Sequence, residues 1–252
     1  MRGLVKLILA CMAIALLAPV AAFVWLYFDY TGLPDWQRLA QFAPDTPEQV
    51  SDPCLKADVP IVAYSYDAIG PTMRAALAAA EGGEDYPGIL EELYLSLTRR
   101  TTPHTASTPV LSYMIAKTMF CQAQTGHTIR ENLDALRLTI QLERHYSHRQ
   151  LFTICANRVY FAEGQYGVEG ASRHFFNKEP DQLRIEEAAL LAGLPRAPGR
   201  YSPRWHPDVA IERRNKVIDR MIATHAITLA DGKLAKAAPL TAIPTTPGIP
   251  DR

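Results

Sequence analysis

A long apolar run without any charged residue, residues 7–28, is the first strong pattern along the chain. A helix of about 20 apolar residues crosses the hydrocarbon core of a bilayer, so this run predicts a transmembrane anchor. Arg2 and Lys6 precede the run and acidic residues follow it, which places the N-terminus on the cytoplasmic side. A cleaved signal peptide is the alternative, because Val-Ala-Ala at residues 20–22 resembles a small-residue cleavage site. The body of the protein is therefore expected outside the cytoplasmic membrane.

After residue 60, the apolar positions recur mostly at helical spacing. Pro71 near the start and Gly82 past the end bracket an alanine-rich helix. Capping boxes at residues 128–131 and 147–150 mark the starts of two more helices. Too few β-branched alternating runs remain for a large sheet, so the body is predicted to be mainly α-helical. The expected helices cover residues 71–81, 89–98, 110–121, 129 onward, 151–159, 186–193 and 207–223.

These patterns divide the chain into five parts. They are a cytoplasmic N-terminus (1–6), the transmembrane anchor (7–28), an irregular Pro- and Asp-containing neck (29–60), one folded domain (61–230) and a Pro- and Thr-rich tail expected to be disordered (231–252).

Composition gives no support to nucleic-acid binding or to a metal site and excludes few other functions. The chain has 26 basic and 26 acidic residues, and this balance gives no support to nucleic-acid binding. The histidines show no HExxH-type pairing, so the sequence gives no positive support to a metal site. Cys54 and Cys121 could form a disulfide in an oxidising compartment or stay separate thiols, and spacing leaves both open.

The densest group of motifs lies in residues 141–222. Gly164 and Gly167 allow a tight turn with positive φ, and aromatic residues surround them. The segment resembles the second half of the peptidoglycan glycosyltransferase (transglycosylase) domain, glycosyltransferase family 51. Its fourth and fifth motifs are matched by Asn157, Tyr160, Gly164, Tyr166, Gly167, Ala171, Phe175, Phe176, Lys178 and the run Glu187–Pro198. We expect the two phenylalanines to pack in the core. The resemblance implies a mainly α, lysozyme-like, bilobed domain over residues 61–230.

The first half of the domain departs from the family pattern. Glu81 ends the alanine-rich helix where the family has its first glutamate, but its Asp partner is absent. Glu84-Asp85 is an alternative position for the acidic pair in a shifted register, but the flanking helix favours Glu81. Of the family's second motif, only the terminal Leu-x-Lys part has a counterpart here, as Ile115-Ala116-Lys117. Ungapped counting puts Ala135 where the third motif has its glutamate, whereas a shift of one residue puts Asp134 there.

The family reaction assigns roles to these residues by resemblance. A sugar hydroxyl attacks the anomeric carbon of a lipid-linked sugar and pyrophosphate leaves, which requires a general base and positive charge or a metal at the leaving group. Glu81 would be the base and Asp134 a second carboxylate. Lys117 and Arg130 would hold the pyrophosphate; a divalent metal is an optional cofactor. The alternative is that Glu81 is a solvated carboxylate at a helix end and Lys117 a solvated lysine on the surface.

Asn157 and Tyr166 are further candidate substrate-binding residues by the same resemblance.

Two functions follow as hypotheses. The first is a membrane-anchored glycosyltransferase of the bacterial cytoplasmic membrane that polymerises lipid II into glycan strands. The second is a pseudoenzyme that binds or scaffolds cell-wall precursors or other cell-wall synthases, and the altered first half favours it. The motifs Ser-x-x-Lys and Lys-Thr-Gly, which are typical of a penicillin-binding transpeptidase domain, do not occur. A glycosyltransferase-only architecture is therefore expected.

Overall fold

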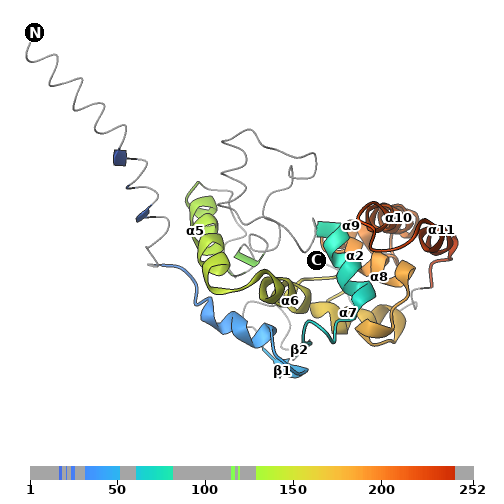
Figure 1. Ribbon diagram of the computed structural model, residues 1–252, viewed down its shortest axis with the longest axis horizontal. Coiled ribbons are helices and arrows are strands. Elements are labelled where there is room, and N and C mark those ends of the chain that lie inside the picture. The colour runs from blue at the N-terminus through green and yellow to red at the C-terminus, as the bar shows by residue number, and fades with distance from the viewer. Residues whose placement is uncertain are drawn as a thin grey trace, which may run out of the picture.

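The computed structural model describes residues 17–18, 21, 24–25, 32–51, 61–81, 115–116, 119 and 129–241, with the side chains of residues 81 and 129–132 excluded. This part of the chain is mainly helical, with a single two-stranded sheet (Figure 1). The helices are α2 (Pro71–Glu81), α5 (Ile129–His145), α6 (His148–Arg158), α7 (Gly167–Phe176), α8 (Ile185–Gly193), α9 (Pro198–Tyr201), α10 (Pro207–Ala223) and α11 (Leu229–Ala237). Two 3-10 helices, η1 (Gln37–Phe42) and η2 (Pro180–Gln182), and strands β1 (Glu48–Val50) and β2 (Ile61–Ala63) complete it.

The strongest local signals of the sequence are confirmed as helices. α2 begins at Pro71 and ends at Glu81, and α8 and α10 lie where the apolar periodicity predicts them. The capping box before α6 forms as expected: the amide of Gln150 donates to Ser147 Oγ (3.3 Å), and the amide of Ser147 donates to Gln150 Oε1 (2.9 Å). The helix expected over 89–98 lies outside the described residues, whereas residues 115–116 and 119 of the next one are helical.

The expectation of an irregular neck over residues 29–60 was wrong for part of that segment. η1 buries Leu39 and Phe42, and β1 pairs antiparallel with β2 in the register Val50↔Ile61. A three-residue strand and a six-residue 3-10 helix are too short to give a periodic pattern. Their stability comes from partners distant in sequence, which local patterns do not record.

The expectation of a disordered tail from residue 231 was also wrong at its start. Residues 231–237 belong to α11, whose N-cap Thr228 accepts a hydrogen bond from the amide of Asp231 (3.1 Å). Gly232 allows close packing, because a Cβ there would lie 2.4 Å from Cδ1 of Ile222 on α10. This close approach is a tertiary contact, and the composition of the tail does not reveal it.

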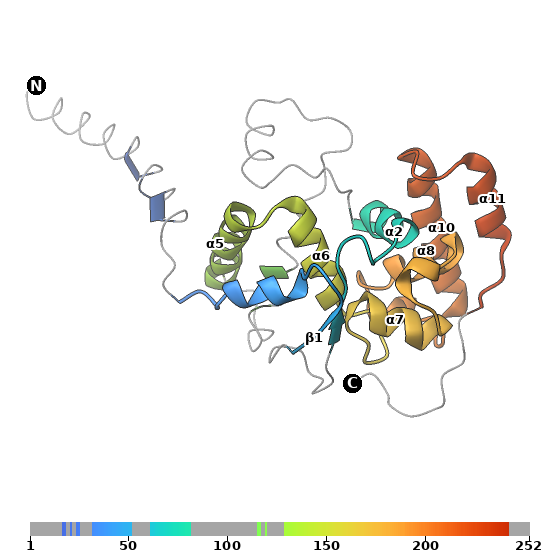
Figure 2. The same ribbon diagram turned by 60° about the horizontal axis from the view of Figure 1, so that its bottom comes forward.

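Two hydrophobic clusters form the core of the described part of the chain. The first lies among α2, α7, α8 and α10, and the second lies among η1, β1, β2, α5 and the buried residues 115–116 and 119. α6 contributes to both: Phe152 and Ala156 to the first, Leu151 and Ile154 to the second. Both views show α6 between α5 on one side and α2 on the other (Figures 1 and 2). Phe175 and Phe176 are buried in the first cluster, which confirms their predicted packing role.

Asn157 on α6 ties the sheet and η1 to this central helix. Its Nδ2 donates to the carbonyls of Phe42 (2.9 Å) and Tyr64 (2.7 Å), and its Oδ1 accepts from the amide of Tyr64 (3.0 Å). The side chain is fully buried, so these three bonds replace the water that an exposed carboxamide would bind.

The predicted membrane anchor falls almost entirely outside the described residues. Of residues 7–28, the structure describes 17–18, 21 and 24–25, all of them helical. The ring of Trp25 lies 4.5 Å from the guanidinium carbon of Arg137 on α5. Within the described ranges, no helix has both the length and the apolar character that a membrane span requires. Cys54 and Cys121 also lie outside these ranges, and Cys155 is buried.

The two glycines predicted to have positive φ provide a matched test of the fold. Gly164 (φ +77°) has open space around an added Cβ, whereas at Gly167 (φ +76°) a Cβ would lie 2.7 Å from the carbonyl oxygen of Asn157. We expect Gly164→Ala to lower the free energy of unfolding by about 1 kcal/mol, through backbone strain alone. Gly167→Ala should lower it by about 3 kcal/mol, because α7 must also move away from α6. Denaturant unfolding measures both; equal losses would contradict the packing of α7 on α6.

Candidate functional site

Glu81, the candidate general base, is the last residue of α2. Met73, Ala76 and Ala80 bury one face of this helix in the first cluster, where α2 packs on α8 and α10. The backbone of Glu81 is therefore fixed by a well-packed helix end, although its side chain is outside the described atoms.

Asp134, the candidate second carboxylate, lies on α5 and keeps about a quarter of its side chain exposed (25%). One of its oxygens lies 3.0 Å from Nη1 of Arg137, one turn further along the same helix. Ala135, the residue in the ungapped register, is fully buried in the core. Arg130 is on α5 four residues before Asp134, so the two share a face of the helix.

The candidate carboxylates lie on helices of different hydrophobic clusters. Glu81 is on a helix of the first cluster, and α5, which carries Arg130 and Asp134, packs its Leu138 and Leu142 in the second cluster. Lys117 lies outside the described residues.

Asn157 and Tyr166, two of the candidate substrate-binding residues, serve the fold in the described structure. The carboxamide of Asn157 is fully used by backbone groups, so its role there is to position α6 against β2 and η1. Tyr166 is half-buried, precedes α7 and lies with its ring centroid 5.0 Å from that of Tyr160. Both residues flank the turn that leads into α7.

This turn is conformationally unusual. Ala162 (φ +89°) and Glu163 (φ +50°) precede Gly164, so three successive residues have positive φ. Such backbone is held only when its surroundings determine it. Here the carboxylate of Glu163 accepts a hydrogen bond from Ser202 Oγ (2.8 Å) and lies 3.0 Å from Nε2 of His174.

A chain of polar groups links β2 to α7. The hydroxyl of Tyr64 donates to Glu179 Oε2 (2.5 Å), and Arg173 bonds to both Glu179 and Glu169. Burial and the hydrogen bond to Glu179 raise the pKa of Tyr64 to about 12, so this phenol stays protonated at physiological pH. The group is thus a donor that holds the segment after β2 against α7.

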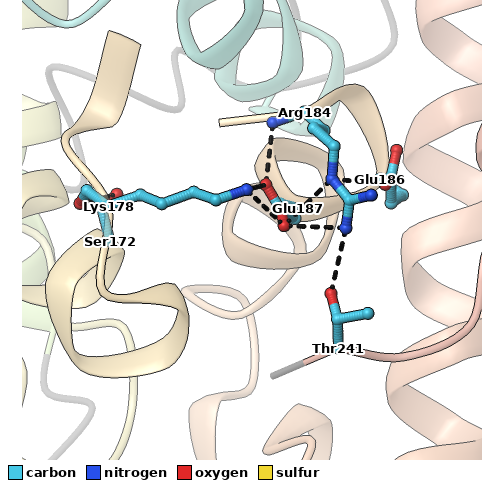
Figure 3. Close-up of polar contacts among 6 residues, drawn as sticks. All are labelled: Ser172, Lys178, Arg184, Glu186, Glu187 and Thr241. Carbon is cyan, nitrogen blue, oxygen red and sulfur yellow. Dashed lines mark hydrogen bonds and ion pairs between the residues drawn. The ribbon is translucent and has the colours of Figure 1, made fainter. Parts of the chain in front are cut away.

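An ionic cluster centred on Glu187 links the segment that follows α7 to the start of α8 (Figure 3). The carboxylate is only 3% exposed, and Lys178 Nζ donates to both of its oxygens (2.9 and 2.8 Å). Arg184 donates from its amide (2.9 Å) and from Nη2 (3.0 Å), and its Nη2 also reaches Thr241 Oγ1 (3.3 Å). Ser172 on α7 fixes the Lys178 backbone by donating to its carbonyl (2.7 Å).

By family resemblance, Lys178 and Glu187 lie in adjacent motifs, and nothing in the motifs pairs the two side chains. One pattern in the sequence does indicate that Glu187 caps a helix. Glu187 lies three residues after Arg184, at the third position of α8, where a glutamate side chain accepts a hydrogen bond from the backbone amide at the helix start. Burial by itself raises the pKa of Glu187, but the hydrogen bonds from Lys178 and Arg184 outweigh it and bring the pKa below its usual value. The cluster therefore stabilises the fold more when Glu187 is ionised than when it is neutral.

Within the described part of the chain, no three His, Cys, Asp or Glu side chains gather as metal ligands would. Asp134, the described candidate carboxylate, is paired with a cation from its own helix.

The ionised Glu187 cluster should make stability dependent on pH. Glu187→Gln should lower the free energy of unfolding by about 2 kcal/mol at pH 7, because the buried hydrogen bonds lose their charge. The pKa of Glu187 is lower in the folded than in the unfolded chain, so its stabilisation is complete above the unfolded value of about 4.3 and is lost as pH falls through the folded value. The difference in the free energy of unfolding between the wild type and Glu187→Gln should therefore become smaller as the pH is lowered.

Glu212→Gln is the control for this experiment. Glu212 pairs with Lys216 on the exposed face of α10, and the hydrogen bond from Lys216 is the main cause of its lowered pKa. Because both partners are exposed, this substitution should leave the unfolding curve unchanged. A pH-independent gap between wild type and Glu187→Gln would contradict the role given to the carboxylate.

Comparison with known proteins identifies the family. Residues 61–222 match the family described as Transglycosylase. The chain is 29% identical over 248 residues to penicillin-binding protein 1A of Aquifex aeolicus, which covers 94% of this chain and 34% of that protein. It is 44% identical over 84 residues to penicillin-binding protein 1F of Bacillus subtilis (33% of this chain, 12% of that protein). Over 174 residues it is 29% identical to penicillin-binding protein 1A of Escherichia coli (66% and 20%).

The chain spans about a third of the length of the Aquifex protein and smaller shares of the other two. The family match runs from β2 through nearly all of α10 and includes the turn, the pair Lys178 and Glu187, and both helices that carry candidate carboxylates. The chain therefore belongs to the transglycosylase family, glycosyltransferase family 51.

Proposed function

We propose that this protein is a peptidoglycan glycosyltransferase that polymerises lipid II, a lipid-linked disaccharide, into glycan strands. The observation that carries the proposal is the family match over residues 61–222, which includes α2 with Glu81 at its end and α5 with Asp134. The two hydrophobic clusters agree with the bilobed, lysozyme-like domain that the family resemblance implies.

In the proposed reaction, a sugar hydroxyl attacks the anomeric carbon of the lipid-linked sugar. The bond from that carbon to the pyrophosphate oxygen breaks, and the pyrophosphate leaves on its lipid. Glu81 accepts the hydroxyl proton, and a position at a firmly packed helix end suits a base that must be held in place. Lys117 and Arg130 supply positive charge against the pyrophosphate.

We further propose that residues 7–28 anchor the protein in the bacterial cytoplasmic membrane, with the body on the outer side. The charge-free composition of this run and the helical conformation of its described residues support the anchor. The contact between Trp25 and Arg137 supports a location of α5 close to it. An enzyme held there would meet a precursor whose lipid lies in the same membrane.

A catalytically inactive binding protein is the second candidate, and one observation favours it. Asp134 already bonds to Arg137 of its own helix, and a carboxylate neutralised in this way is less suited to assist catalysis. Such a protein would bind lipid II, a nascent glycan strand or other cell-wall synthases without polymerising the precursor.

Polymerisation of labelled lipid II by the detergent-solubilised full chain tests the proposal. We expect glycan strands from the wild type and a rate at least about 100-fold lower for Glu81→Gln, since a general base contributes about 10²–10⁴-fold. Glu84→Gln, which alters the acidic residue of the shifted register, should retain its activity.

The outcomes separate the two functions and the two registers. Folded wild-type protein that binds labelled lipid II but makes no polymer would favour the binding protein over the enzyme. Polymerisation that survives Glu81→Gln and is lost in Glu84→Gln would move the base to the shifted register.

A further inference from the structure

The C-terminal end of α2 is held by a cation from a distant part of the chain. Nη1 of Arg220, on α10, donates to the carbonyl of Ala80 (3.0 Å) and more weakly to that of Ala79 (3.4 Å). The last carbonyls of a helix have no partner within the helix, and they form the negative end of its dipole. An arginine is well suited to this place, because it offers both donors and positive charge.

This contact acts directly beside Glu81. The carbonyl of Ala80 belongs to the peptide unit that joins Ala80 to Glu81, so Arg220 bonds to the backbone that carries the candidate base. The neighbouring apolar side chains hold the same helix end: Ala80 is buried in the first cluster, and so is Met221, which follows Arg220. Apolar packing restrains the side of the helix, and Arg220 restrains its end.

We infer that Arg220 is a positioning residue for Glu81. It fixes the last peptide unit of α2 to α10 and so holds the base where the attacking hydroxyl must meet it. The catalytic part of this inference rests on the proposed function. The mechanical part, that Arg220 secures the end of α2, rests on the two hydrogen bonds alone.

α10 itself supplies a matched comparison. Arg214 also donates to two backbone carbonyls, of Lys236 (3.0 Å) and Ala238 (2.9 Å), but these belong to α11 and the residue after it. It makes the same kind of bond from the same helix to a different element. Loss of Arg214 should loosen α11 and leave the end of α2 in place.

The experiment compares Arg220→Met, Arg220→Lys and Arg214→Met in the full chain. In steady-state polymerisation of labelled lipid II, Arg220→Met should lower kcat about tenfold or more and leave KM within about twofold, because misplacing a catalytic group mainly affects the chemical step. Arg220→Lys keeps a charged donor and should recover at least about half of the activity. Arg214→Met should keep kcat within about twofold even if it lowers the melting temperature. Lys216→Met, at an exposed pair on the same helix, replaces it if Arg214→Met does not fold.

Hydrogen exchange in the same proteins separates this inference from the proposed function. Arg220→Met should speed exchange in the last turn of α2, and Arg214→Met should speed it in α11. Unchanged exchange at the end of α2 in Arg220→Met would overturn the inference whether or not the protein is an enzyme. An active wild type with an unchanged kcat in Arg220→Met, or an equal loss in the control, would overturn it as well. A wild type without activity, but with faster exchange at α2 in Arg220→Met, would contradict only the proposed function.

Discussion

The carboxamide of Asn157 is the interaction on which the arrangement of this domain depends. It lies on α6, the helix that contributes to both hydrophobic clusters, and it bonds to three backbone groups of Phe42 and Tyr64. All three groups lose water in the folded chain, and a buried polar group without a partner costs about 1–3 kcal/mol. One side chain thus determines where η1 and the end of β2 lie on α6.

The rest of the domain extends from this point through close backbone contacts. The carbonyl of Asn157 leaves no room for a Cβ at Gly167, so α7 starts against α6. The Glu187 cluster then fixes the connection from α7 to α8, and α8 packs on α2. Glu81 at the end of α2 is therefore positioned by a succession of contacts that ends at Arg220. The motifs of the second half are thereby connected through packed helices to the helix that carries Glu81, the proposed base.

The sequence predicts those elements whose stability is local. α2, α6, α8 and α10 have Pro starts, a capping box or a long apolar period, and they form where expected. β1, η1 and α11 were missed, because contacts with distant segments stabilise them. Family resemblance suggests that Asn157 binds substrate. In the structure its side chain is buried and its carboxamide bonds to backbone groups, which the sequence does not indicate. Arg220 gave no local signal at all, since its partners lie 140 residues away.

The most direct test of this account is native-state hydrogen exchange of the Asn157→Leu protein. Leucine has a similar size but cannot bond to the backbone of Phe42 or Tyr64. We expect η1 and β2 to lose their protection against exchange, while α8 and α10, which pack in the first cluster, keep theirs. If η1 and β2 exchange as slowly as in the wild type, the carboxamide does not hold them and is free for another use, such as contact with substrate.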